Sequence, residues 1–132
     1  MPRIIARDKN KKLLGLVTFQ IDKNNKTCEI VSIDAVKKGQ GIGTELVKRI
    51  EQEAKKAGCK KIWLITVNDN PEAVAFYVKR GYRLVKVHLN ALEKSRKLKP
   101  NIPKIGKHNI PITDEWEFEK QILKKIGIIY IC

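Results

Sequence analysis

The sequence KKGQGIGT, residues 37–44, decides how this chain folds. It follows an apolar run at residues 28–36 that is typical of a strand, and it opens a stretch in which apolar residues recur every three or four positions up to Gly58. That spacing predicts an amphipathic helix with Gly58 as its C-terminal cap. Glycines in a strand-to-helix turn let the backbone approach a ligand closely, and the helix dipole favours an anion there. The stretch therefore predicts an anion-binding turn, with Lys37 and Lys38 adding positive charge at its rim.

The periodicity of the chain on either side of this turn orders the remaining elements. Five stretches are typical of strands: residues 3–7, 13–21, 28–36, 61–67 and 82–89. The first three are joined by short polar turns and predict an antiparallel meander, whereas residues 61–67 are nearly all apolar, as in a strand buried on both faces. Asn70-Pro71 is a strong helix start, with Asn as the N-cap and Pro at the first helical position, and Gly81 ends that helix. Residues 91–98 are expected to form a third, short helix.

These elements predict a single α/β domain, residues 1–132, of the α+β type, with a mixed, mainly antiparallel sheet flanked by helices. Prolines at positions 100, 103 and 111 predict an extended, irregular segment after the last helix. Near the C-terminus, the apolar run IGIIYI at residues 126–131 is more typical of a strand than of a solvated tail. We expect it to cover exposed apolar surface, either in its own subunit or in a symmetric homodimer.

Composition excludes several classes of protein. The chain has 132 residues, of which 42% are hydrophobic and 32% charged, and this fits one compact domain. No apolar run approaches the roughly 20 residues that cross a bilayer, and the N-terminus lacks a signal-peptide core, so a cytoplasmic location and no membrane partner are expected. Cys28, Cys59 and Cys132 lie far apart and form no Cys-x-x-Cys pair, so we expect reduced thiols and no metal site.

Positive charge is the strongest compositional signal, since 28 Lys and Arg against 14 Asp and Glu give a net charge of +14. Such charge can track a nucleic-acid backbone, attract a polyphosphate cofactor or solvate a lysine-rich surface. The densest basic cluster is Lys94, Arg96, Lys97, Lys99, Lys104 and Lys107. An acidic patch follows it directly, at Asp114, Glu115, Glu117 and Glu119. Because this patch would repel phosphate, the pattern disfavours nucleic acid as the partner.

Two motifs carry a resemblance to a known family. Lys38-x-x-Gly41-x-Gly43 resembles the Arg/Gln-x-x-Gly-x-Gly/Ala signature of the GNAT N-acetyltransferase superfamily. Asn70-x-x-Ala73-x-x-x-Tyr77-x-x-x-Gly81-Tyr82 is similar to that family's second signature, and the two lie in the family's order on either side of a buried strand. The runs LITVNDN at 64–70 and KPNIP at 99–103 also resemble an uncharacterised bacterial and archaeal branch. The resemblance extends from Arg3 to about Lys120.

The resemblance implies acetyl-CoA as the acetyl donor and assigns residues to it. The backbone amides that would hold the CoA pyrophosphate are those of Gly39, Gln40, Gly41, Ile42, Gly43 and Thr44. The backbone of Ile33, Asp34 and Ala35 would pair with the pantetheine arm, and an amide there would polarise the thioester carbonyl. Asn70 would contact the pantetheine arm. Tyr77 would protonate the departing thiolate, a task that suits a phenol because it stays protonated at neutral pH.

The chain departs from the family pattern in two respects. Lys38 stands where the family usually has Arg or Gln, which is a small change for a residue that presents its backbone amide. The chain also begins at what resembles the family's second strand, so we expect the first strand and two helices, which wall one side of the acceptor site, to be missing. The resemblance therefore indicates the acetyl-CoA side of the site and leaves the acceptor side open.

Two carboxylates on the strand before the turn are candidates for the base that takes a proton from the acceptor amine. Glu29 and Asp34 occupy odd and even positions, which predicts opposite faces of the strand, so only one of them can line the cleft. Asp34 is nearer the glycine turn and is preferred. The lone histidines His88 and His108 are expected on a strand surface and in a loop. Cys28 and Cys59 are expected to be small core residues.

The sequence thus predicts an acetyl-CoA-dependent N-acetyltransferase, in which an amine carried by a small molecule or a protein attacks the thioester directly. Two alternatives stay open. One is a truncated CoA-binding homologue without significant catalysis, and the other is a small basic nucleic-acid-binding protein, which would show a steep salt dependence of its affinity.

Overall fold

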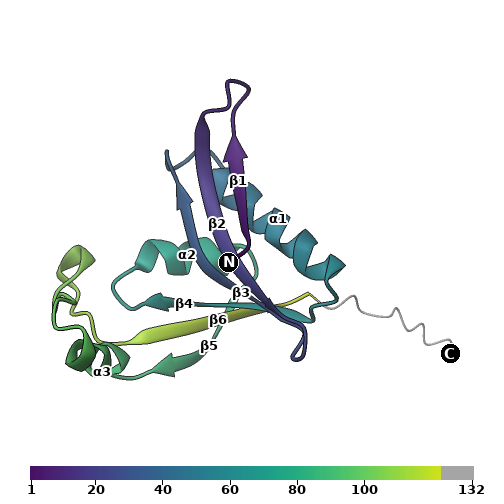
Figure 1. The fold of residues 1–132 in the computed structure, drawn as a ribbon. Helices are drawn as coiled ribbons and strands as arrows, with labels where there is room; N and C mark the ends of the chain where they lie inside the picture. The colour runs from purple at the N-terminus through teal and green to yellow at the C-terminus, as the bar shows by residue number, and fades with distance from the viewer. Residues whose placement is uncertain (123–132) are drawn as a thin grey trace, which may run out of the picture. The chain divides into compact units, whose positions relative to one another are not determined.

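The computed structural model describes residues 1–122 of the chain (Figure 1). They fall into two compact units, residues 1–62 with 121–122, and residues 63–120. The single domain over residues 1–132 stays a prediction, and the apolar run at residues 126–131 lies outside the described residues. No helix within residues 1–122 is long and apolar enough to cross a membrane.

The elements follow the predicted order, with one additional strand. They are β1 (Arg3–Arg7), β2 (Leu13–Asp22), β3 (Thr27–Ala35), α1 (Ile42–Lys56), β4 (Lys61–Val67), α2 (Pro71–Lys79), β5 (Arg83–His88), α3 (Ala91–Leu98), the 3₁₀ turn η1 (Lys107–Asn109) and β6 (Glu115–Gln121). The strand order in the sheet is β1-β2-β3-β4-β6-β5. The pairings β1–β2, β2–β3 and β5–β6 are antiparallel, which confirms the predicted meander and the mixed α/β class.

The first unit packs α1 against the meander of β1, β2 and β3, which lie beside it in Figure 1. Alternate side chains of β2 and β3 point into this core, as a strand with one buried face requires. The helix buries one face, as its apolar spacing predicts. The buried apolar side chains of these elements are Val17, Phe19, Cys28, Ile30, Leu46, Val47, Ile50 and Ala54.

The second unit contains the strand that the sequence analysis did not assign, β6. Its residues Trp116 and Phe118 alternate with three glutamates, and Phe118 is only 1% exposed. Phe118 lies opposite Leu84 of β5, and Trp116 lies opposite Val87. The acidic patch of the sequence is therefore in large part the polar face of a half-buried strand.

Gly15 on β2 allows α1 to approach the meander closely. A Cβ atom at this position would lie 2.8 Å from the Asp34 backbone oxygen, 2.8 Å from Ile42 Cγ2 and 3.1 Å from Leu46 Cδ1. Real Cβ atoms essentially never make contacts under 3.0 Å, so any side chain at position 15 would push the first two turns of α1 or the end of β3 away. Gly15 thus sets the position of the glycine turn that precedes α1.

Replacing Gly15 with alanine tests this packing. We expect Gly15→Ala to lower the free energy of unfolding by about 1–3 kcal/mol, the usual cost of forcing an extra methyl group into a packed core. Thermal and urea unfolding followed by circular dichroism measure the change. An unchanged melting temperature would contradict the close approach of α1 to β2.

Candidate functional site

The turn between β3 and α1 has the backbone that anion binding requires. Gly39 and Gly41 adopt φ of +82° and +75°, a left-handed conformation that glycine reaches at low cost, and Gly41 is the N-cap of α1 without a side-chain hydrogen bond to the helix. The Glu45 N–H donates to the Gly41 carbonyl oxygen at 3.1 Å, as expected where an N-cap residue starts a helix. Because residues 36–41 are exposed, the backbone of this turn and the positive end of the helix dipole are accessible to an anion.

Strand β3 contains a β-bulge that corrects one expectation. Thr18 pairs with Ser32, but the next residue, Phe19, pairs with Ile30, so Val31 is an extra residue in β3. The bulge reverses the alternation of faces along β3. An odd-numbered residue before Val31 therefore lies on the same face as an even-numbered residue after it.

Glu29 and Asp34 consequently lie on the same face of β3, and the prediction of opposite faces was wrong. Glu29 lies opposite Gln20, and Asp34 lies opposite Leu16. Leu16 and Gln20 are four residues apart on a regular strand and so point the same way. Both carboxylates are on the face opposite to the one on which Val17 is buried.

The two carboxylates differ in their surroundings. Glu29 is half-buried, and this burial raises the pKa of its carboxyl group. Asp34 is exposed. A raised carboxyl pKa makes the Glu29 carboxylate a stronger base than an ordinary glutamate. Between them on the same face, Thr18 Oγ1 and Ser32 Oγ share a hydrogen bond of 2.6 Å, so the face is polar as well as acidic.

In the second unit, Asn70 is the N-cap of α2, as predicted. Its side-chain Oδ1 accepts a hydrogen bond from the Ala73 N–H at 3.2 Å, and Pro71 is the first helical residue. The amide nitrogen of the Asn70 side chain makes no hydrogen bond to another residue within 1–122. The Oδ1 atom of Asn70 therefore caps the start of α2, while its Nδ2 atom can donate a hydrogen bond to a ligand.

Tyr77 lies in the last two turns of α2 and is 5% exposed. Its ring makes edge-to-face contacts with Phe76 and Tyr82, with centroids 5.1 and 5.5 Å apart. Burial raises the pKa of Tyr77 to about 12, an effect that the nearby positive charge of Arg80 opposes. The phenol is therefore protonated throughout the physiological range, and it is a weaker acid than a free tyrosine.

The remaining candidates occupy structural positions. His88 and His108, expected on a strand and in a loop, are found there, and each contacts a carboxylate, Glu117 at 3.1 Å and Glu72 at 2.6 Å. Cys28 and Cys59 are buried free thiols, as predicted, and burial raises the pKa of Cys28 to about 12. Within the described part of the chain, no group of three or more His, Cys, Asp or Glu side chains is arranged to hold a metal ion.

The candidate residues thus form two groups, one in each unit. The first unit carries the glycine turn, the backbone of residues 33–35 and the carboxylates of β3, while the second carries Asn70 and Tyr77. Sequence reasoning missed Gly15, because its importance comes from a helix nearly thirty positions away along the chain.

A comparison with known families decides the assignment of the fold. Residues 2–82, which include the glycine turn and the motif from Asn70 to Tyr82, match the model of the Acetyltransferase (GNAT) family. The chain belongs to the GNAT acetyltransferase family. It is 46% identical over 117 residues to the uncharacterised protein YdhI of Bacillus subtilis, an alignment that covers 89% of this chain and 72% of that protein.

Solved GNAT structures agree with the assignment. An IAA acetyltransferase from Bacillus cereus superimposes with a TM-score of 0.76 at 22% identity, covering 90% of this chain and 76% of that one. A GNAT family acetyltransferase from Elizabethkingia anophelis, solved with acetyl-CoA bound, superimposes with a TM-score of 0.71 at 26% identity. The superposition covers 86% of this chain and 72% of that one. Both proteins share the fold of the chain, and the one from Elizabethkingia anophelis is solved with acetyl-CoA bound.

Proposed function

We propose that this protein is an N-acetyltransferase that moves the acetyl group of acetyl-CoA to an amine acceptor. The observation that carries the proposal is the exposed glycine turn at the start of α1, with two left-handed glycines and no side-chain cap, in a chain of the GNAT family. A capping side chain would occupy the amides that an anion needs, and here the position is left to the ligand.

The first unit binds the phosphates of the donor. The pyrophosphate accepts hydrogen bonds from the amides of residues 39–44, and the α1 dipole with Lys37 and Lys38 stabilises its charge. The backbone of Ile33, Asp34 and Ala35 is extended at the end of β3, as pairing with the pantetheine arm requires. A backbone N–H in this stretch polarises the thioester carbonyl as negative charge develops on its oxygen.

The second unit supplies two side chains to the donor. Asn70 donates its free amide N–H to the pantetheine arm while its Oδ1 keeps α2 capped. Tyr77 gives its phenolic proton to the CoA thiolate as the carbon–sulfur bond breaks, and it recovers a proton from solvent after the products leave. Because burial makes Tyr77 a weak acid, the transfer must accompany the build-up of charge on sulfur.

Glu29 is the base for the acceptor. Its carboxylate takes the proton that the attacking amine loses on forming the new carbon–nitrogen bond, so protons balance between Glu29 and Tyr77. Half-burial raises the pKa of Glu29, which strengthens its carboxylate as a base. The acceptor amine belongs to a small molecule or a protein, and we propose a cytoplasmic enzyme that forms homodimers.

Binding of acetyl-CoA separates this proposal from its alternatives. Tight binding without turnover of any amine would favour a CoA-binding homologue without catalysis. Absence of acetyl-CoA binding, together with nucleic-acid affinity that falls steeply with salt, would favour a nucleic-acid-binding protein.

A valine at position 43 tests the phosphate site. Gly43 lies within α1 and does not have positive φ, so Gly43→Val leaves the helix able to form but covers the first-turn amides with a branched side chain. We expect acetyl-CoA to raise the melting temperature of the natural protein and not that of the variant. The matched control is Gln52→Val, an exposed position on the same helix, which should keep the ligand-induced shift. A full shift in Gly43→Val would rule out the turn as the phosphate site.

Removing the Tyr77 hydroxyl tests the acid. Tyr77→Phe keeps the aromatic contacts, so acetyl-CoA affinity should stay close to that of the natural protein while kcat falls by about 10²–10⁴-fold. Single-turnover kinetics at saturating acetyl-CoA measure the chemical step. Equal single-turnover rates would make Tyr77 a packing residue.

Two isosteric amides decide between the carboxylates of β3. We expect Glu29→Gln to lower kcat by about 10²–10⁴-fold and to remove the limb of the pH profile in which the rate rises with pH. That limb reflects Glu29 losing its proton, and it should lie above the ordinary range of a glutamate because the Glu29 pKa is raised. Asp34→Asn is the comparison, and a larger loss in that variant would reverse the assignment.

A further inference from the structure

The segment Lys99–Asp114 connects α3 to β6 and is long for a connection inside a compact unit. None of its residues is fully buried, and its apolar side chains Ile102, Ile110 and Ile112 are only half-buried. It nevertheless folds back on itself through an isolated bridge between Ile105 and Pro111 and a hydrogen bond from the Ile112 N–H to the Lys104 oxygen, at 2.8 Å. Polar contacts with other parts of the second unit contribute to fixing its position.

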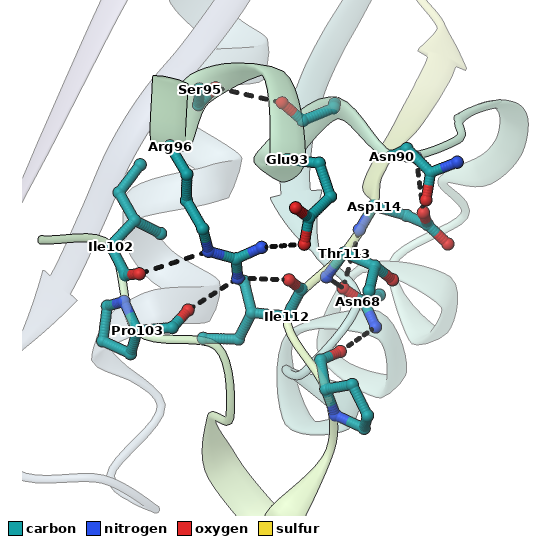
Figure 2. A network of polar contacts seen from close by, with 12 residues as sticks. Asn68, Asn90, Glu93, Ser95, Arg96, Ile102, Pro103, Ile112, Thr113 and Asp114 are labelled. Carbon is teal, nitrogen blue, oxygen red and sulfur yellow. Dashed lines mark hydrogen bonds and ion pairs between the residues drawn. The ribbon is translucent and has the colours of Figure 1, made fainter. Parts of the chain in front are cut away.

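Arg96 on α3 joins both arms of this segment, as Figure 2 shows. Its guanidinium donates to the carbonyl oxygens of Ile102 at 3.2 Å and Pro103 at 2.6 Å in the first arm, and to that of Ile112 in the second. It also pairs with Glu93. The Arg96 side chain is only 9% exposed, although the sequence places it in the basic cluster. The buried Arg96 guanidinium therefore holds the two arms of the segment together through charge-assisted hydrogen bonds.

Asn68, just after β4, holds the second arm (Figure 2). Its Oδ1 accepts from the N–H groups of Thr113 and Asp114, both at 3.0 Å, and its Nδ2 donates to the Pro111 oxygen at 2.8 Å. The Asn68 N–H also donates to the Asp114 oxygen at 3.1 Å. These three side-chain hydrogen bonds restrict both the Asn68 side chain and the backbone of residues 111–114.

The tip of the segment contacts the residues on both sides of Asn70. Asp69 Oδ2 accepts from the Lys107 N–H at 3.1 Å, and Gly106 lies so close that a Cβ atom there would be 2.1 Å from that oxygen. Beyond Asn70, Glu72 pairs with His108 at 2.6 Å. Asn70 is thus enclosed between residues 68–69 and Glu72, all of which the segment binds.

We propose that Asn68 and Arg96 are positioning residues, which hold the segment Lys99–Asp114 against the start of α2 and thereby orient the Asn70 side chain for the pantetheine arm. The inference rests on the proposed function, because it concerns the residue that contacts the donor. It explains why the segment is built from polar bonds to residues 68, 69 and 72 and has no buried residue of its own.

Two variants loosen this arrangement in different ways. Asn68→Ala removes all three side-chain bonds to the second arm. Gly106→Ala keeps the Asn68 side chain. It places a methyl group where the Asp69 carboxylate lies and 2.8 Å from Ile112 Cδ1, at a glycine without positive φ. The matched control is Asn101→Ala, which removes an exposed asparagine of the same segment with no side-chain bond among residues 1–122.

Calorimetry with two ligands distinguishes orientation of Asn70 from a general loss of stability. We expect both variants to bind acetyl-CoA about three- to tenfold more weakly, the value of one hydrogen bond, and the control to match the natural protein. All four proteins should bind 3′-phospho-ADP, the nucleotide of CoA without its pantetheine arm, within about twofold of one another, since the phosphate site is on the first unit.

The outcomes separate the two proposals. Natural acetyl-CoA affinity in both Asn68→Ala and Gly106→Ala would overturn the positioning role and leave the proposed function intact, and so would an equal loss of affinity for both ligands. Failure of the natural protein to bind acetyl-CoA would instead overturn the proposed function, and the positioning role with it. Hydrogen exchange at residues 68–72 reports on the same contacts without ligand and should be faster in both variants than in the control.

Discussion

The close packing of α1 on the meander at Gly15 is the constraint on which the first unit depends. A helix can present its N-terminal amides at the end of β3 only if its first two turns lie close to β2, and a side chain at position 15 would prevent this. The left-handed Gly39 and Gly41 then turn the chain sharply from strand into helix. Packing, turn and helix dipole therefore produce one feature together, an exposed set of amides with partial positive charge.

The features that local chemistry controls could be predicted from the sequence. The glycine turn, the Asn70-Pro71 helix start and the spacing of apolar residues on α1 each depend on neighbours a few positions away. The bulge at Val31 could not, because it is defined only by the register between β3 and β2. This bulge places Glu29 and Asp34 on one face of β3, whereas regular alternation of side chains along the strand would place them on opposite faces. The sequence of β6 alternates aromatic and acidic residues, which is typical of a strand. Its negative charge instead favoured the interpretation of these residues as an acidic surface patch.

The second unit uses a different physical principle from the first. Its segment Lys99–Asp114 has no fully buried residue, and the side chains of Asn68 and Arg96 hold it by binding its backbone carbonyl and N–H groups (Figure 2). Such contacts are directional, so they fix position more strictly than apolar packing of the same strength. A segment of this kind suits the neighbourhood of a residue whose orientation matters, as we propose for Asn70.

The most direct test of the account is residue-resolved NMR of the isotope-labelled protein during titration with acetyl-CoA. The account predicts amide shifts at the glycine turn, residues 39–44, at the end of β3, residues 33–35, and at Asn70, all with the same saturation. Spectra that do not change on titration, or shifts confined to other residues while these stay fixed, would contradict it.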